Sequence, residues 1–385
     1  MNETVLFQNG TNSTLGASPM TRYYKESLGL KVFKLTLQIT VGLIGVIGNL
    51  LVCVVIASRS NMKTKMNILL CSLAVADTGV LLINFPLAAI QEQLPLQYPF
   101  GRWFCLYLGP ATEIFFGASI WSITIIAIER NRNIVRRSKS ECKGLPCKGV
   151  IWKIILLWFA SLLIVSVPLY PIMVYQEFPQ VTICYPEWPD YREGNIYMKA
   201  YTIGLAIFWY LLPLVIITYT YIQISQQLQK STAFHKNMHG ASAKSKLIIK
   251  EEKQRLKQNK KAQMILTPLV VVFAISMLPL NVFRLVQAFY PSFVFYKFYL
   301  ILLSVCAVFV IANSAMDPVV YYIASREFRQ GIRNLLRRKK AERRKHEPKK
   351  LPTTHSYATH PDMRIRARGK RDDSRLQLVN KETII

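Results

Sequence analysis

Four ionisable side chains lie inside long apolar stretches of the sequence, where a charge is costly. They are Asp77, Glu113, Arg284 and Asp317. A charged side chain near the centre of a membrane-spanning helix costs roughly 2.5–3.5 kcal/mol, so such a residue usually has a partner or a function. These four positions are therefore the first candidates for binding or ion chemistry.

Asp77 and Asp317 fall near the middle of their apolar runs. Four more polar residues lie at a similar depth: Asn49, Ser119, Asn313 and Ser314. Such a group of oxygen atoms can hold a small hard cation such as sodium, or form a hydrogen-bonded network between helices. Both interpretations stay open. We call this group the polar centre; the candidate sodium ligands are Asp77 and Ser119, with Asn49, Asn313 and Asp317.

Glu113 and Arg284 lie nearer to one surface, at a depth that a ligand can reach. Glu113 can capture a cationic group, such as the guanidinium of an arginine-containing peptide, through a bidentate pair. Alternatively, Arg284 neutralises Glu113 inside the protein. The two interpretations are linked if a ligand breaks a resting pair.

A proton or ion path through Asp77, Glu113 and Asp317 would make the chain a transporter or channel instead. Transporters often contain inverted repeats, and the sequence shows none. It also shows no catalytic constellation, so we expect a protein that is not an enzyme and requires no cofactor, with sodium as a candidate allosteric ion.

Seven charge-poor apolar runs must position these residues. Hydrophobic residues make up 51% of the chain and charged residues only 18%. About twenty apolar residues suffice for a helix to cross a hydrocarbon core roughly 30 Å thick. The sequence therefore predicts an all-α membrane protein with a bundle of seven transmembrane helices. The runs cover residues 35–58, 66–90, 103–128, 154–175, 201–229, 262–290 and 298–324.

Basic residues predict the orientation of the bundle. The net charge is +28, and most of the 49 lysine and arginine residues lie in the segments after the first, third, fifth and seventh runs. Segments rich in Lys and Arg stay in the cytoplasm. We therefore expect a cytoplasmic C-terminus, an extracellular N-terminus and a multi-pass protein of the plasma membrane. The segment from Lys230 to Lys261 is expected to extend the fifth and sixth helices.

The extracellular features agree with this orientation. N-x-S/T glycosylation sequons begin at Asn2, Asn9 and Asn12. Cys105, at the outer end of the third run, and Cys184, in an outer loop, share the oxidising compartment, so we expect a disulfide that fastens the loop over the bundle. Residues 1–31 are predicted to be a glycosylated extracellular segment.

Each run also carries a short motif. They are Gly48-Asn49, LAVAD ending at Asp77, Cys105 and ERN around the third run, Trp158, Pro213 with Tyr221, Phe273 with Pro279, and DPVVY from Asp317 to Tyr321. Together, in this order, they resemble the rhodopsin-like (class A) G-protein-coupled receptors. The resemblance implies a receptor domain over 32–324, a short amphipathic eighth helix over 325–338 and a disordered tail over 339–385.

The resemblance also implies roles for individual residues. Arg130 matches the family's cytoplasmic latch, with Glu129 as its resting partner, and the sixth helix swings outward to admit a G protein. The implied switch residues are Glu129, Arg130, Tyr221, Phe273, Pro279, Asp317, Pro318 and Tyr321. The chain departs from the family at Met277, where most members carry a Trp switch.

One residue that is absent from the sequence narrows the class of ligand. Thr112 stands where amine receptors carry an Asp, which disfavours simple amines. The loop after the fourth run contains QVTICY, typical of a β-hairpin, and CYPEWP, similar to neuropeptide receptors. We expect a short, basic or amidated peptide ligand; the alternative is a lipid or small anionic molecule. The expected contacts are Thr112, Glu113, Phe116, Glu187, Trp188, Met277, Asn281 and Arg284.

Expected partners beyond the peptide are a heterotrimeric G protein and membrane lipids, and no nucleic acid. Thr353 and nearby hydroxyl residues of the tail are candidate kinase sites for arrestin recruitment. The final residues ETII fit a PDZ-domain ligand.

Overall fold

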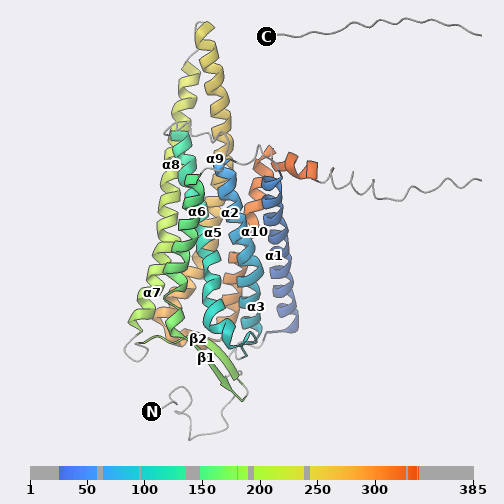
Figure 1. Cartoon of the computed structure of the whole chain (residues 1–385), viewed down its shortest axis with the longest axis vertical. Coiled ribbons are helices and arrows are strands. Elements are labelled where there is room, and N and C mark those ends of the chain that lie inside the picture. Colours follow the sequence, from blue (N-terminus) through green and yellow to red (C-terminus); the bar gives the residue numbers. More distant parts are fainter. Residues whose placement is uncertain are drawn as a thin grey trace, which may run out of the picture. The chain divides into compact units, whose positions relative to one another are not determined.

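Seven helical spans form the bundle, as the sequence predicted (Figure 1). The computed structural model describes residues 26–58, 64–94, 97–135, 148–179, 181–189, 195–237, 243–326, 328–335 and 337. Asn2, Asn9, Asn12 and the predicted tail lie outside these residues. The described helices are long and apolar enough to cross a membrane, which makes the chain a multi-pass membrane protein.

Of the first three spans, one is a single helix and two are built from helices joined end to end. The first is α1 (Leu28–Ala57). The second consists of α2 (Lys65–Gly79), the π-helical η3 (Val80–Asn84) and α3 (Phe85–Gln93). The third consists of α4 (Gly101–Trp103), the π-helical η4 (Phe104–Leu108) and α5 (Gly109–Val135).

The remaining four spans follow the same plan. The fourth consists of α6 (Lys148–Ser161), the π-helical η5 (Leu162–Ser166) and the 3₁₀ turn η6 (Tyr170–Ile172). The fifth consists of α7 (Ile196–Ala206), the π-helical η7 (Ile207–Leu211) and α8 (Leu212–Asn237). The sixth is α9 (Ala243–Phe289), followed by the 3₁₀ turn η8 (Pro291–Phe295), and the seventh is α10 (Tyr299–Ala324).

Prolines explain the π-helical turns. Pro86, Pro110, Pro168 and Pro213 each stand two residues after the end of a π-helical turn. Proline has no N–H, and its ring pushes away the carbonyl four residues earlier. An extra residue in the preceding turn relieves that clash.

A β-hairpin covers one end of the bundle, which we call the hairpin end. Strand β1 (Met173–Phe178) pairs antiparallel with β2 (Val181–Pro186), with Met173 opposite Pro186 and Phe178 opposite Val181. The predicted fourth run, 154–175, was wrong at its end because its last residues belong to β1. Pro168 and Pro171 stop the helix there, and the following residues pair with β2 instead.

Small residues bring α1 and α10 close together. A Cβ atom added at Gly45 would lie 2.9 Å from the Cβ of Ala315, and one at Gly48 would lie 2.8 Å from the Cβ of Pro318. Gln38 reinforces the contact by donating a 3.1 Å hydrogen bond to Ser304. This close packing of small residues is typical of membrane helices, and it places Asn49 beside the segment that carries Asp317.

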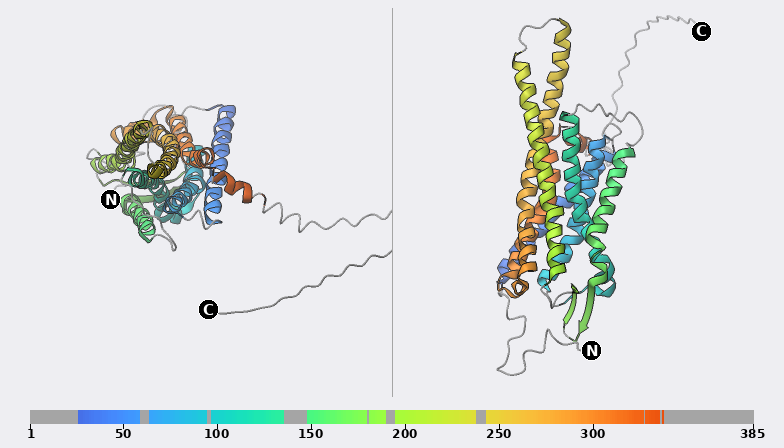
Figure 2. Two further views of the ribbon diagram at one scale, coloured as in Figure 1. Left: turned by 90° about the horizontal axis from the view of Figure 1, so that it is seen from above. Right: turned by 90° about the vertical axis from the view of Figure 1, so that its left-hand side faces the viewer.

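The end opposite the hairpin is where α8 and α9 extend beyond the other helices, as predicted (Figures 1 and 2). We call it the opposite end. A further short helix covers residues 328–335, within the predicted eighth helix. Phe328 is buried in a cluster with Val55 and Tyr321, and Gly331 approaches Val55 closely. The short helix is therefore packed against α1 and α10.

Candidate functional site

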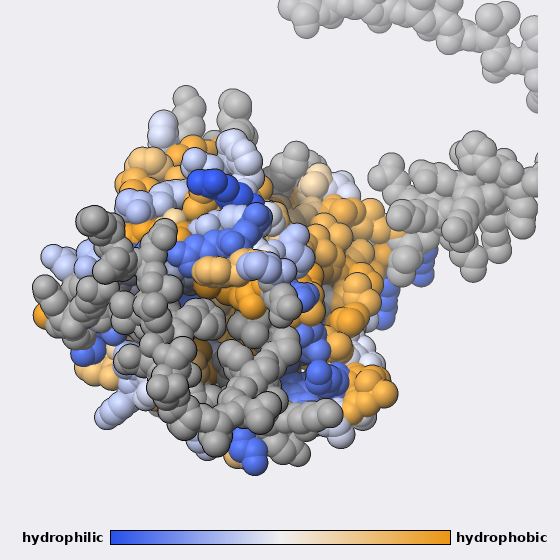
Figure 3. Space-filling model, turned by 90° about the horizontal axis from the view of Figure 1, so that it is seen from below, coloured by the Kyte–Doolittle hydropathy of each residue, from blue (hydrophilic) through white to orange (hydrophobic). Residues whose placement is uncertain are grey.

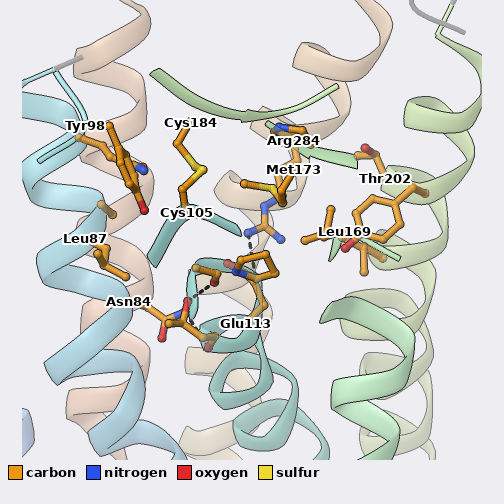
Figure 4. Close-up of a pocket in the computed structure, with 18 of the residues that line it drawn as sticks. Asn84, Leu87, Tyr98, Cys105, Glu113, Leu169, Met173, Cys184, Thr202 and Arg284 are labelled. Carbon is orange, nitrogen blue, oxygen red and sulfur yellow. Dashed lines mark hydrogen bonds and ion pairs between the residues drawn. A yellow bond between two sulfur atoms is a disulfide. The ribbon is translucent and has the colours of Figure 1, made fainter. Parts of the chain in front are cut away.

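A cavity of about 440 Å³ lies at the hairpin end of the bundle. Its lining comes from the second to the sixth spans, with Leu169 from the fourth, and the hairpin and the residues after it lie at the rim (Figure 4). From the outside, hydrophilic side chains gather in the middle of this end and hydrophobic ones on its flank (Figure 3). A cavity of this size and mixed lining is typical of a ligand site.

Glu113 and Arg284 face each other inside this cavity. The Arg284 side chain reaches from α9 to Glu113 on α5, and an Nη–Oε2 distance of 3.6 Å separates them (Figure 4). Both side chains keep some exposure, 31% for Arg284 and 28% for Glu113. The resting pair that the sequence left open is thus present, and it lies where a ligand can reach both members.

An aromatic ring supports the cation of this pair. The Arg284 guanidinium carbon lies 5.8 Å from the centroid of the Phe116 ring, and Phe116 itself is buried. A guanidinium over an aromatic face gains a cation–π attraction of roughly 0.5–1 kcal/mol at exposed sites. Phe116 therefore helps to hold the Arg284 side chain in place inside the cavity.

Uncharged polar residues of the cavity were missed by the sequence analysis. Asn84 donates a 3.1 Å hydrogen bond to the backbone carbonyl of Thr112, and Gln91 and Gln287 also line the cavity. Asn and Gln are common near helix ends, so their residue type alone does not indicate a binding site. The spacing of the lining residues on the second span could have indicated one, because Asn84, Leu87, Ala88 and Gln91 follow the i, i+3, i+4, i+7 pattern of one helix face.

Tyr98 adds a hydroxyl group to the same lining. Burial raises the pKa of Tyr98 to about 12, and the neighbouring Tyr175 acts in the same direction. The hydroxyl is therefore neutral at physiological pH and able to donate a hydrogen bond.

The predicted ligand contacts divide into two groups. Thr112, Glu113, Trp188 and Arg284 line the cavity, and the Trp188 ring packs on Tyr201 with centroids 5.4 Å apart. The cavity lining given by the described residues does not include the other four. Phe116 and Met277 are buried, Glu187 is exposed, and Asn281 donates to the carbonyl of Met277.

The predicted disulfide is present at the rim. It joins Cys105 in η4 to Cys184 in β2, and both residues contribute to the cavity lining. Because the bond links strands to a membrane-spanning helix, it holds the hairpin at the mouth of the cavity.

The polar centre lies deeper in the bundle. Asp77 accepts a 2.7 Å hydrogen bond from Ser119, and Asp317 is near enough to Asp77 for the two carboxyl groups to interact. Among the described residues, one oxygen of each carboxylate has no hydrogen-bond donor. Buried, unpaired carboxylate oxygens are the donors that a hard cation prefers, so these residues fit a sodium ion.

The other polar residues at this depth connect helices. Asn49 donates to the carbonyls of Gly45 and Ser314, both at 3.0 Å, which joins α1 to α10. Ser276 of α9 donates to Asn313 of α10 at 3.0 Å. The polar centre is therefore also the hydrogen-bonded network that the sequence proposed as the alternative to an ion site.

At the opposite end, Glu129 contacts the Lys153 ammonium group of α6 and lies 3.6 Å from an Nη atom of Arg132. Asn131 donates a 2.7 Å hydrogen bond to Gln223, which joins α5 to α8. The pairing of Glu129 with Arg130 stays a prediction. Lys153 was missed because it lies 24 residues from Glu129 and no local pattern connects them.

The remaining predicted switch residues lie along the bundle core. Phe273 is fully buried and packs near Tyr210, with ring centroids 6.1 Å apart. Tyr321 is buried, and its hydroxyl has no hydrogen-bond partner among the described residues. Tyr221 is partly buried in α8. Pro279 and Pro318 stand inside α9 and α10.

The sequence of this chain is similar to those of known proteins. Residues 48–321 match the family described as "7 transmembrane receptor (rhodopsin family)". Mouse neuromedin-U receptor 2 is 29% identical over 311 residues, 76% of this chain and 72% of that protein. Rat galanin receptor type 1 is 26% identical over 86% of this chain and 88% of its own length. Cattle neuropeptide Y receptor type 2 is 27% identical over 77% and 73%. The chain therefore belongs to the rhodopsin family of seven-transmembrane receptors, which are signalling receptors and not enzymes.

Proposed function

We propose that this receptor binds a short extracellular peptide with a cationic, arginine-like group and activates heterotrimeric G proteins. The similar receptors for neuromedin U, galanin and neuropeptide Y support a peptide ligand. Membership of a receptor family also sets aside the transporter interpretation.

The observation that carries this proposal is the Glu113–Arg284 pair in the cavity. Its 3.6 Å separation is longer than the roughly 2.7–2.9 Å of a charge-assisted hydrogen bond. A ligand guanidinium can make two shorter bonds to Glu113. Arg284 is then released to bind a carbonyl or carboxylate oxygen of the same peptide. The amides of Asn84, Gln91 and Gln287 can hold backbone or terminal amide groups of the peptide.

The hairpin end would face the extracellular side. The disulfide between Cys105 and Cys184 lies there and needs an oxidising compartment. The described helix ends that adjoin the basic segments lie at the opposite end, which favours a cytoplasmic position for it. Glycosylation at the N-terminal sequons belongs to the same proposal, as do arrestin, kinases and a PDZ protein at the C-terminal tail.

Activation would be a population shift. A peptide that binds the active bundle more tightly than the resting one favours the active state by that difference in affinity. Arg284 and Met277 both belong to α9, so the ligand acts on the helix that carries Phe273 and Pro279. Movement of α9 would free Arg130 for the G protein at the opposite end.

A sodium ion would be an allosteric partner of this bundle. Asp77, Ser119 and Asp317 would hold it, with Asn49 and Asn313 nearby. It would supply a positive charge that offsets the two buried carboxylates. Its release would change the electrostatic balance between the second and seventh spans.

The test uses the full-length chain in cells with calcium and cAMP readouts. A panel of short amidated peptides containing arginine is compared with peptides that carry citrulline, which has the same shape without the charge. We expect Glu113→Gln to weaken an active arginine peptide by roughly 10–150-fold, because a hydrogen bond to a charged group contributes about 1.5–3 kcal/mol. Glu187→Gln, at an exposed acid, is the matched control and should change little.

The alternative ligand, a lipid or small anion, is favoured by the presence of Arg284 in the same cavity. It predicts that an anionic lipid activates the receptor, that Arg284→Ala abolishes this response and that Glu113→Gln leaves it intact. If no arginine peptide activates the receptor and the anionic lipid gives these three results, the peptide proposal is wrong and the lipid or anion proposal takes its place. In either case Arg130→Ala should remove signalling while ligand binding persists.

A further inference from the structure

Two free cysteines face each other between the first and second spans. The Sγ atoms of Cys53 in α1 and Cys71 in α2 lie 3.5 Å apart, and the Cys53 thiol also points to the Cys71 backbone carbonyl at 3.9 Å. Both side chains are partly exposed at the bundle surface. Neither belongs to the ligand cavity or to the polar centre.

The two sulfur atoms need only a small approach to form a bond. A disulfide needs an S–S distance of about 2.0 Å, so the sulfurs must approach by about 1.5 Å. Rotation of the two side chains can supply this movement. Cys306, the other free cysteine of the described residues, is buried on α10 and serves as an internal comparison.

The pair lies close to the opposite end of the bundle. Cys53 is four residues before the end of α1 and Cys71 six residues after the start of α2, or about 6 and 9 Å along their helices. Small neutral oxidants can reach this depth from the adjacent water. In the proposed orientation this side is the reducing cytoplasm, where the resting form is the dithiol.

The surroundings couple the pair to the end of the seventh span. Cys53 and Cys71 pack against the buried cluster that contains Val55, Tyr321 and Phe328. A covalent bond between the sulfurs would fix α1 against α2 beside the residues on which α10 and the short helix rest.

We propose that Cys53 and Cys71 form an oxidisable pair that closes into a reversible disulfide between α1 and α2. One sulfur attacks hydrogen peroxide: an S–O bond forms, the O–O bond breaks, and water leaves with the thiol proton. The second sulfur then attacks the resulting sulfenic acid: the S–S bond forms, the S–O bond breaks, and a second water carries away the other proton. Two thiols lose two electrons in total, and one peroxide becomes two waters.

The test uses the purified full-length receptor in lipid nanodiscs, with Cys142→Ser and Cys147→Ser to remove two cysteines outside the described residues. The receptor is treated with hydrogen peroxide, the remaining thiols are alkylated with N-ethylmaleimide, and the peptides are identified by mass spectrometry. We expect the loss of two alkylated thiols and a cross-linked peptide that contains both cysteines. A reducing agent should restore both thiols. Cys53→Ser and Cys71→Ser should each abolish the cross-link, and Cys306→Ser should leave its yield unchanged.

Several results would overturn the proposal. Oxygen addition to either sulfur without a cross-link would show two independent thiols. Full alkylation after peroxide treatment would show that the pair does not react. As a second measurement on the unmutated pair, phenylarsine oxide, which binds two adjacent thiols at once, should protect both cysteines from alkylation. Absence of this protection would also count against the pair.

Discussion

Lys34 lies at the hairpin end between two acidic residues, and the balance of their charges predicts how mutations there change the stability of the receptor. Its ammonium group lies 2.8 Å from Glu26 and 2.7 Å from Glu92. The three side chains are largely buried, with exposed fractions of 11% for Lys34, 7% for Glu26 and 5% for Glu92. The group therefore carries one more negative than positive charge. The Lys34 ammonium group offsets the repulsion between the two carboxylates.

Replacing Lys34 by Met removes the cation that lies between the two carboxylates and leaves both carboxylates close together. Their oxygens can be no more than about 5.5 Å apart, and at an effective dielectric constant of about 20 two such charges repel by roughly 3 kcal/mol. Loss of one partner from a buried ion pair typically costs about 3–5 kcal/mol. We therefore expect Lys34→Met to destabilise the receptor by about 3 kcal/mol, which corresponds to a loss of roughly 5 °C in Tm for a bundle of about 300 residues.

The assay is the Tm of the purified receptor in detergent, followed by intrinsic fluorescence. Glu92→Gln leaves one cation and one carboxylate, so its Tm should stay close to that of the unmodified receptor. The double variant Lys34→Met with Glu92→Gln should recover part of the loss. Lys31→Met, at an exposed lysine of the same helix, is the matched control. If Glu92→Gln lowered the Tm as much as Lys34→Met, the charge-counting argument would be refuted.

Three further predictions concern other parts of the bundle. A Cβ at Gly79 would lie 2.2 Å from a phenylalanine ring of α5, so Gly79→Ala should lower the Tm, whereas Gly204→Ala, with open space around it, should keep or raise it. Lys153→Met should lower basal G-protein activity by up to about fivefold, because Glu129 then has one competing cation fewer beside the latch arginine, and the partly exposed pair that is lost is worth at most about 1 kcal/mol; an increase measured by GTPγS binding would contradict this. Sodium chloride should raise the Tm more than choline chloride at equal ionic strength, and Asp77→Asn should remove the difference; equal effects of the two salts would exclude the ion.

The seven spans could be predicted because long apolar runs with few charges form helices in a membrane. Their ends could not. Residues such as Met173 and Val174 suit both a helix and a strand, and only the partner strand decides between them. The first apolar run was predicted to begin at residue 35, directly after Lys34, because a lysine normally indicates an exposed position. The helix α1 begins earlier, at Leu28. The contact of Lys34 with Glu92 joins residues 58 positions apart, which no local pattern contains.

Part of the cavity lining could be predicted in the same way. Charged residues in apolar runs were easy to find, so Glu113 and Arg284 were identified. The cavity also uses Asn84, Gln91 and Gln287, whose amides cost little at helix ends and leave no trace in composition. Met277 was expected at the ligand but is buried in the core, because depth along a helix does not give the direction of a side chain.

The proline-linked π-helical turns give the receptor a way to change its ligand preference in one evolutionary step. Each such turn holds one residue more than an α-helical turn, and one residue corresponds to about 100° of rotation around a helix. Deletion of a single residue in η3 would therefore turn Leu87, Ala88 and Gln91 to a different face while the span stays anchored at its other end. A single-residue deletion at this turn would therefore exchange the side chains that line the cavity while the far end of the second span keeps its packing.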